Sequence, residues 1–368
     1  MSKRKPKRIT IKIGTRVLTD KNNKINQEII KNLSEEIAAL LDKKIEVIVV
    51  SSGAIGSGLG ILEIQKKGRS LSELQAIASI GQNHLMDTYN KYLAKKGYIA
   101  GQILLTQEDF NSRRRFLNIR HTVNALFKFK AVPVINENDS ISTEEIKCGD
   151  NDRLSGLVAD LTDSEMLIIL TDVDGVYDES LNVIAKIENG ESVDRLKVFC
   201  RDKTSEVSTG GMVTKLDAVK SAVHSGIECV ITDGLRKNVI KDIVLEKKSI
   251  GTYFFAAERT LTARKRWIAF SIKPKGKIII DNGAEKALVK DKKSLLPSGI
   301  LDADGKFSKG DVLEIFSESG KALARGLSNY ASGEIKKIKG KKSAEIKKQL
   351  GYKDCDEVIH RDNLVILD

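Results

Sequence analysis

Two glycine-rich segments contain the residue types that bind phosphate groups. Ser51 to Gly58 reads SSGAIGSG and follows an apolar run, and Thr209 to Lys215 reads TGGMVTK and adds a lysine. A glycine-rich turn that enters a helix presents backbone N–H groups and the positive end of the helix dipole to an anion. Any tight turn between strand and helix also favours glycine, so a purely structural role stays open for either segment. The glycine patterns of P-loop enzymes and of dinucleotide-binding proteins are both missing.

Acidic and amide side chains gather in two further segments. Asn136 to Asp139 reads NEND, and Gly149 to Arg153 reads GDNDR. Carboxylates and amides near glycine turns can bind an ammonium group, orient lysines or hold Mg²⁺. A solvated turn rich in Asp and Asn has the same composition, so this alternative stays open. The 4 histidines are scattered and have no recognisable nucleophile or metal partner, which leaves no obvious histidine base.

The elements that would position these residues alternate between strand and helix. Helical periodicity predicts helices with N-caps at Asn26 and Ser72, and a later helix from Val213 to Ser225. Such alternation is typical of a mainly parallel α/β sheet, here expected to extend to about residue 260. Ligands of open α/β sheets bind beyond the carboxyl ends of the strands, where Lys12–Thr15, Ser51–Gly58, Asn136–Asp139 and Thr171–Asp172 fall. The predicted strands are Ile9–Ile13, Ile45–Val50, Tyr98–Leu105, Val132–Ile135, Met166–Leu170 and Ile227–Ile231.

The pattern changes after residue 263. Residues 264–272 are expected to form a linker, and residues 273–368 contain short strands divided by turns such as Asn282–Gly283 and Asp304–Gly305. We therefore predict an α/β domain over residues 1–263, in which residues 1–8 form a basic tail. A small β-rich domain, with the form of a barrel, is predicted over residues 273–368.

Composition limits the class of protein. A chain of 368 residues, 41% apolar and 30% charged, is typical of a soluble protein with two domains. No apolar run reaches the roughly 18 residues of a membrane span, and the basic start lacks the apolar core of a signal peptide, so a cytoplasmic location is expected. The 4 distant cysteines favour neither a disulfide framework nor a zinc site.

Charge is unevenly distributed along the chain. The net charge is +12, and residues 264–368 carry 23 lysines and arginines against 15 aspartates and glutamates. A basic C-terminal module is compatible with a nucleic-acid partner or with a lysine-rich surface that favours solubility.

Taken together and in order, these segments closely resemble the glutamate 5-kinases, a branch of the amino-acid kinase family, in their long form with a C-terminal PUA domain. The resemblance covers nearly the whole chain, and its joint match is strong although each piece is weak. The matching segments are Lys12–Thr15, Ser51–Ile55, Arg115–Asn118, Val132–Asp139, Lys147–Asp152, Leu170–Asp172, Thr209–Lys215, Arg264–Trp267, Ser294–Ile300, Phe307–Gly310 and Leu350–Tyr352.

The resemblance implies a fold and a reaction. The fold would be a three-layer α/β sandwich around a mainly parallel sheet, followed by a PUA-like barrel. The reaction would be ATP- and Mg²⁺-dependent phosphorylation of the side-chain carboxylate of L-glutamate to L-glutamyl 5-phosphate, the first step of proline biosynthesis. A carboxylate is already ionised at neutral pH, so the reaction needs no general base.

The resemblance also assigns roles to residues. Lys12 and Lys215 would flank the transferred phosphoryl group, and Asp152 would hold the two lysines. No protein residue is assigned as a metal ligand. One departure is Arg16, which stands where the family usually has a small residue; its side chain either points away or alters the phosphate pocket. Glutamate would be bound by Ser52, Asp139 and Asn151 with help from Asp150 at the amino group, and the nucleotide by Lys12, Thr171, Asp172, Thr209, Gly210, Gly211, Met212, Val213, Thr214 and Lys215.

Partners and rival functions follow from the same resemblance. Proline is expected as a feedback inhibitor, the chain as a homo-oligomer (dimer or tetramer), and the acyl phosphate as a possible substrate for transfer to glutamyl-phosphate reductase. The nearest rival is another small-molecule kinase of this fold, acting on a different carboxylate or on a nucleoside monophosphate. PUA domains elsewhere bind RNA, but the kinase-like segments argue against RNA as the main partner, and RNA binding by this PUA-like domain is not expected.

Overall fold

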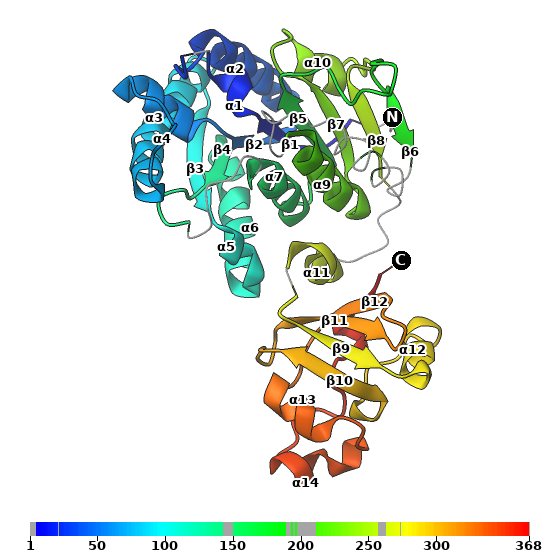
Figure 1. Ribbon diagram of the computed structural model, residues 1–368. Coiled ribbons are helices and arrows are strands. Elements are labelled where there is room, and N and C mark those ends of the chain that lie inside the picture. The colour runs from blue at the N-terminus through cyan, green and yellow to red at the C-terminus, as the bar shows by residue number, and fades with distance from the viewer. Residues whose placement is uncertain are drawn as a thin grey trace. The chain divides into compact units, whose positions relative to one another are not determined.

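The computed structural model describes residues 5–20, 22–142, 150–188, 193, 196, 211–256, 263–272 and 274–367. The chain divides into two compact units, Met1–Thr260 and Leu261–Asp368 (Figure 1). Each unit has its own buried apolar core.

The first unit is built on an eight-stranded sheet in the described part of the chain, with the strand order β3-β4-β2-β1-β5-β7-β8-β6. All neighbouring strands are parallel except β7 and β8. The mainly parallel sheet expected from the sequence is therefore confirmed. Its strands are β1 (Arg8–Ile13), β2 (Glu46–Ser51), β3 (Ile99–Leu105), β4 (Ala131–Glu137), β5 (Met166–Thr171), β6 (Lys186–Glu188), β7 (Glu228–Asp233) and β8 (Thr252–Phe255).

Helices cover both faces of this sheet. Figure 1 shows α2 and α10 on one face and α7 and α9 on the other. Neighbouring side chains of a strand point to opposite faces, and in β5 Ile168 joins the core beneath α2 whereas Leu167 joins the core beneath α9. Both faces are buried, which gives the predicted three layers. The helices are α1 (Thr15–Leu18), α2 (Gln27–Asp42), α3 (Ala54–Leu62), α4 (Leu71–Ala94), α5 (Gln107–Asn111), α6 (Arg113–Lys128), α7 (Asp150–Leu161), α9 (Gly211–His224) and α10 (Val239–Val244).

Two helix starts test the predicted caps. The Asn26 side chain accepts a hydrogen bond from the Ile29 N–H, so the predicted N-cap of α2 is confirmed. The prediction of Ser72 as the cap of α4 is wrong, because Ser70 caps that helix. Ser70 has Glu73 three residues later, and the two form a reciprocal capping box.

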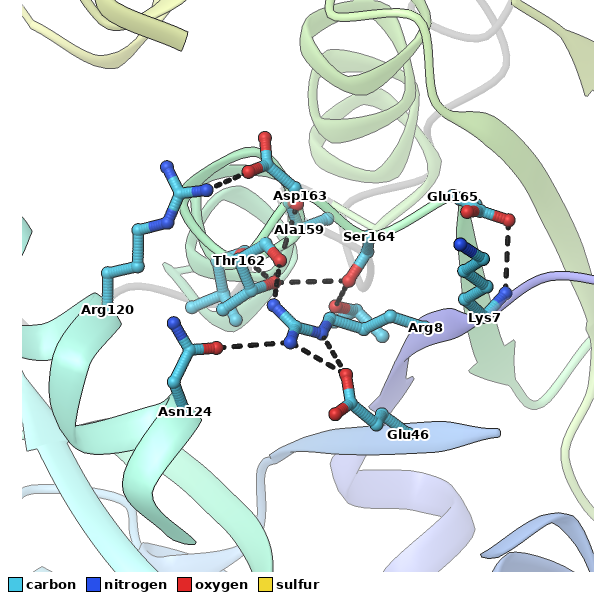
Figure 2. Close-up of polar contacts among 12 residues, drawn as sticks. Lys7, Arg8, Glu46, Arg120, Asn124, Ala159, Thr162, Asp163, Ser164 and Glu165 are labelled. Carbon is cyan, nitrogen blue, oxygen red and sulfur yellow. Dashed lines mark hydrogen bonds and ion pairs between the residues drawn. The ribbon is translucent and has the colours of Figure 1, made fainter. Parts of the chain in front are cut away.

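Strand β1 is fixed at its first residue by an arginine (Figure 2). The Arg8 guanidinium donates from Nε to Glu46 Oε2 at 2.7 Å, from Nη2 to Asn124 Oδ1 at 3.0 Å, and from Nη1 to the Thr162 carbonyl. These partners lie on β2, on α6 and just after α7. Arg8 therefore belongs to the sheet instead of to the basic tail expected from the sequence, and it anchors the C-terminal end of α7.

The second unit contains a five-stranded sheet among its described residues, with the order β10-β9-β11-β12-β13. The strands are β9 (Gly276–Ile280), β10 (Ile300–Gly305), β11 (Val312–Ser317), β12 (Ala322–Leu327) and β13 (Leu364–Ile366). The helical segments are α11 (Ala263–Arg266), the π-helix η1 (Trp267–Ser271), α12 (Asn282–Val289), the 3₁₀ turns η2 (Pro297–Gly299), η3 (Ser343–Glu345) and η4 (Arg361–Asn363), α13 (Ser332–Ile338) and α14 (Ile346–Leu350).

Two local expectations in this unit differ from the structure. Asn282–Gly283 opens helix α12 and does not form a turn between strands, because the Asp281 side chain accepts a hydrogen bond from the Ala284 N–H and caps the helix. The segment expected as a linker is largely helical, and Trp267 and Ile268 in it are buried. The division into units falls earlier, between Thr260 and Leu261. Within the described residues, none of the helices has the length and apolarity needed to cross a membrane.

Candidate active site

Two lysines and one aspartate form a buried charge cluster at the carboxyl edge of the first sheet. Lys12 Nζ lies 2.6 Å from Asp152 Oδ1, and Lys215 Nζ lies 3.3 Å from Asp152 Oδ2. The exposed fractions of the three side chains are 6%, 2% and 12% for Lys12, Asp152 and Lys215. One carboxylate therefore bridges two ammonium groups, as the resemblance implies.

The alternation of side chains along β1 places Lys12 in this cluster. Ile11 and Ile13 point into the core beneath α2, so Lys12 between them points to the opposite face, toward α7. Asp152 lies in the first turn of α7, and Lys215 lies near the start of α9. The strand and the two helices thus converge at one end.

A glycine allows α7 and α9 to pack closely. A Cβ on Gly156 would lie 3.1 Å from the carbonyl oxygen of Ala218, tighter than most contacts of that kind. With the helices this close, Thr214 Oγ1 donates to Asp152 Oδ2 at 2.7 Å. Lys215 Nζ also donates to the Gly211 carbonyl at 2.9 Å, which fixes the ammonium group from a second side.

Burial and charge set the ionisation of this cluster. Burial lowers the pKa of the Lys12 ammonium below its ordinary 10.5, and the attraction of Asp152 opposes this shift. Burial alone would raise the pKa of Asp152, but the charges of Lys12 and Lys215 and the hydrogen bonds to the carboxylate outweigh burial and hold it below 3.8. Asp152 is therefore ionised at neutral pH, and its carboxylate lies between the amino groups of two lysines. Such a cluster attracts an anion.

The segment after β1 runs directly against the end of β5. The Gly14 N–H donates to the Leu170 carbonyl at 3.0 Å, and a Cβ on Gly14 would lie 3.3 Å from that oxygen. The absence of a side chain at Gly14 therefore lets the two segments meet. Beyond it, Arg16 Nη1 lies 2.9 Å from Asp172 Oδ2, and Thr171 Oγ1 donates to Asp172 Oδ1 at 3.0 Å.

Two glycines in the segment after β2 have different structural roles. Gly53 has a φ of 95° and directly precedes α3, so the left-handed turn there requires glycine. Gly58 has a packing role, because a Cβ on it would lie 2.1 Å from the carbonyl oxygen of Ile77 in α4. Next to the turn, Ser52 is buried, and its N–H donates to the Ile13 carbonyl at 3.1 Å.

A chain of amides leads from α4 to the start of α7. Asn136 Nδ2 donates to Gln82 Oε1 at 2.8 Å, and Asn151 Nδ2 donates to Asn136 Oδ1 at 2.9 Å. The last amide in this series ends in Asn151 Oδ1. This oxygen is buried and has no hydrogen-bond partner in the structure. A ligand that donates an N–H, such as an ammonium group, would satisfy it. The sequence missed Gln82 altogether, since a single glutamine inside a helix gives no local signal.

The remaining predicted residues divide into three groups. Asp139 follows β4 and is half-buried, and Met212 and Val213 lie in the first turn of α9. The backbone of Asp150 opens α7, but its side chain lies outside the described part of the structure. Thr209 and Gly210 also lie outside the described residues.

A cavity of about 350 Å³ lies beside the segment after β4. Its walls include Glu137 at the end of β4 and Arg115, whose Nη1 lies 3.1 Å from Asp109 Oδ1. Arg115 thus lines the cavity while its side chain stays 59% exposed. Among the described residues, no three His, Cys, Asp or Glu side chains gather as a metal-binding group.

Comparison with known proteins identifies the family of the chain. The sequence model of the amino acid kinase family matches residues 7–233, and that of the PUA domain matches residues 276–350. The chain belongs to the amino acid kinase family. It is a kinase of this family with a PUA domain in its second unit.

Curated relatives match the chain over almost its whole length. A glutamate 5-kinase of Thermoanaerobacter sp. (strain X514) is 45% identical over 365 residues, with 98% of both chains covered. A glutamate 5-kinase of Caldanaerobacter subterraneus subsp. tengcongensis is 46% identical over 367 residues, again with 98% of both chains covered. Among solved structures, the UMP kinase from Bacillus anthracis is similar with a TM-score of 0.47 and 17% identity, covering 68% of this chain and 97% of that one.

Proposed function

We propose that this kinase transfers the terminal phosphoryl group of ATP to the side-chain carboxylate of L-glutamate, which gives L-glutamyl 5-phosphate and ADP. The relatives of similar length named glutamate 5-kinase support the substrate. The observation that carries the proposal is the single carboxylate of Asp152 between the ammonium groups of Lys12 and Lys215.

The charge cluster suits this transfer. An oxygen of the glutamate carboxylate attacks the terminal phosphorus, and the bond from phosphorus to the bridging oxygen of ADP breaks. Negative charge lies on the equatorial oxygens during the transfer, and fixed cations stabilise it. Lys12 and Lys215 supply two such cations, while Asp152 limits their movement. Mg²⁺ would come with the ATP phosphates, because Asp152 and Asp172 are both engaged by cationic side chains.

Glutamate would bind next to the amide chain. The unpartnered Asn151 Oδ1 can accept a hydrogen bond from one N–H of the α-ammonium group. The carboxylate of Asp139 supplies a charge partner for the same group, and Ser52 at the turn before α3 supplies polar contacts. Asp150 would assist at the amino group. Thr171, Asp172 and the segment from Thr209 to Lys215 would hold the nucleotide.

The reaction is tested by trapping its product. Protein incubated with ATP, Mg²⁺ and L-glutamate should form a hydroxamate with hydroxylamine, in step with ADP release. In the variant Lys215→Ala this product should fall by about 10²-fold or more, because losing one positioned charge donor costs that much. Lys237→Ala is the matched control, since Lys237 is an exposed lysine that pairs with Glu28 at 3.6 Å. Wild-type protein that forms no hydroxamate from glutamate, but phosphorylates another acid or a nucleoside monophosphate, would exclude the proposed substrate.

Regulation and assembly extend the proposal. Proline added to the same assay should lower the rate of hydroxamate formation. An unchanged rate at high proline would contradict feedback inhibition by proline.

We further propose that the chain forms a cytoplasmic homo-oligomer (dimer or tetramer) and that its acyl phosphate passes to glutamyl-phosphate reductase. Light scattering of the purified chain tests the oligomer.

A further inference from the structure

Arg16 and Asp172 join two segments that the sequence keeps far apart. Arg16 lies in α1, two residues beyond Gly14, and Asp172 directly follows β5. Strands β1 and β5 are parallel neighbours with Ile13 opposite Leu170, so the segments after them leave the sheet at one edge. There Arg16 Nη1 lies 2.9 Å from Asp172 Oδ2.

The ion pair between Arg16 and Asp172 lies at the same edge of the first sheet as the cluster of Lys12, Asp152 and Lys215. Gly14 separates the two features along the chain, and a Cβ on it would lie 3.7 Å from Lys12 Nζ. The Arg16 and Asp172 side chains are 69% and 35% exposed, and ion pairs with this exposure contribute little to folding stability. Folding stability therefore explains little of why Arg16 and Asp172 are paired. Their position beside the charge cluster points instead to a role in ligand binding.

A free carboxylate at this edge would oppose binding of a nucleotide. The guanidinium of Arg16 and the hydroxyl of Thr171 counter the effect of burial and hold the pKa of Asp172 below its ordinary value, so Asp172 is ionised at neutral pH. The phosphates of a nucleotide are polyanionic, and an unneutralised carboxylate nearby repels them. Arg16 cancels this charge and holds one carboxylate oxygen, while Thr171 holds the other.

We propose that Arg16 is a positioning residue of the nucleotide site, which acts by neutralising Asp172 and fixing its carboxylate while the phosphates bind. The inference rests on the proposed function, because it takes the edge formed by β1 and β5 as the place of the phosphates. Arg16 acts through Asp172 and does not itself need to touch the nucleotide.

A double-mutant cycle tests this arrangement with ADP and Mg²⁺ as the probe. Calorimetry of the full chain should show that Arg16→Ala weakens ADP binding by about fivefold, the size expected for a partly exposed ion pair. Asp172→Asn has its own effect, but adding Arg16→Ala to it should cause no further loss, since the charge to be neutralised is gone. Arg16→Lys should recover most of the affinity, and the effect should shrink at high salt.

The controls separate this role from a structural one. Melting temperatures of all Arg16 variants should stay within a degree or two of wild type, and Lys237→Ala should change neither melting nor ADP binding. Additive losses in the double variant, or a large drop in melting temperature for Arg16→Ala, would overturn the inference. Equal ADP affinity in wild type and Arg16→Ala would overturn this inference alone, whereas failure of the wild type to bind ADP would overturn the proposed function with it.

Discussion

Asp152 favours the charged form of the Lys12 side chain beside it. Its carboxylate is the main opposing influence to the burial that lowers the pKa of Lys12. Replacing it with the neutral amide of asparagine keeps the shape of the side chain but removes this influence. The residue therefore controls the pH range in which Lys12 stays protonated.

The variant Asp152→Asn should show this control in its pH dependence. Its kcat is expected to fall by about 10²-fold or more, because both lysines lose their common partner. The pKa of Lys12 should fall further, so the alkaline loss of activity should begin at a lower pH than in wild type. Initial rates over a range of pH measure this shift. Asp217→Asn, on the exposed side of α9, is the control. If Asp152→Asn lost activity at the same alkaline pH as wild type, the role of Asp152 in keeping Lys12 protonated would be contradicted.

Much of the site is accessible to sequence reasoning at this scale, but the contact between Arg16 and Asp172 is not. Lys12, Asp152 and Lys215 were identified through the resemblance, and the structure brings them together. The pairing of Arg16 with Asp172 depends on the register between two strands whose paired residues, such as Ile13 and Leu170, lie 157 residues apart along the chain, and no local pattern encodes that register. Gln82 was missed for the same reason, since its role comes entirely from the amide that packs against it.

At the scale of elements, contact between α3 and α4 depends on glycines. A Cβ on Gly81 would lie 1.9 Å from the Ala54 carbonyl oxygen and 2.3 Å from the Gly58 nitrogen. No rotation of a side chain can relieve an overlap with backbone, so the helices would have to move apart. Because only Gly53 separates Ser52 from the start of α3, such a shift would also disturb the turn beside the site.

Gly81→Ala should therefore destabilise the protein by about 3 kcal/mol or more, the upper range for overpacking. Urea unfolding followed by circular dichroism measures this loss. Asn83→Ala on the same helix is the control, because Asn83 is exposed and alanine favours the helix by a few tenths of a kcal/mol, roughly. A Gly81→Ala protein as stable as wild type would show that α3 and α4 do not pack this closely.

The central strands of the first sheet were predicted from the sequence, whereas the short strands β6 and β8 and some helix starts were not. Buried strands such as β2 and β5 were found from their β-branched runs, which suit a sheet covered on both faces. The error at Ser72 concerns which of several polar residues caps a helix, and the error at Asn282 took the capped start of a helix for a turn. That choice depends on side-chain geometry over three or four residues, and composition alone does not decide it.

At the scale of the whole molecule, the separate cores of the two units predict that the units unfold in separate thermal transitions. The cores beneath α2 and α9 belong to the first unit, and a different set of residues forms the core of the second. Calorimetry of the full chain should resolve two transitions, only one of which rises on addition of ADP and Mg²⁺. At a ligand concentration of 100 times Kd, the stabilisation of that unit is about 2.7 kcal/mol. An equal rise in both transitions would count against a nucleotide site confined to the first unit.

The burial of Lys12 also constrains the order of events during synthesis. Lys12 lies on β1, near the beginning of the chain, whereas its counter-charge Asp152 is made 140 residues later. A buried ammonium without a partner is costly, by several kcal/mol, roughly. Strand β1 can pair with β2 before that point, but Lys12 gains its ionic partner only once α7 has emerged, and the second neighbour of β1, strand β5, comes later still along the chain. Release of the nascent chain, or a pause in synthesis, before α7 is made would therefore leave the side of β1 that later pairs with β5 as an exposed edge of the sheet.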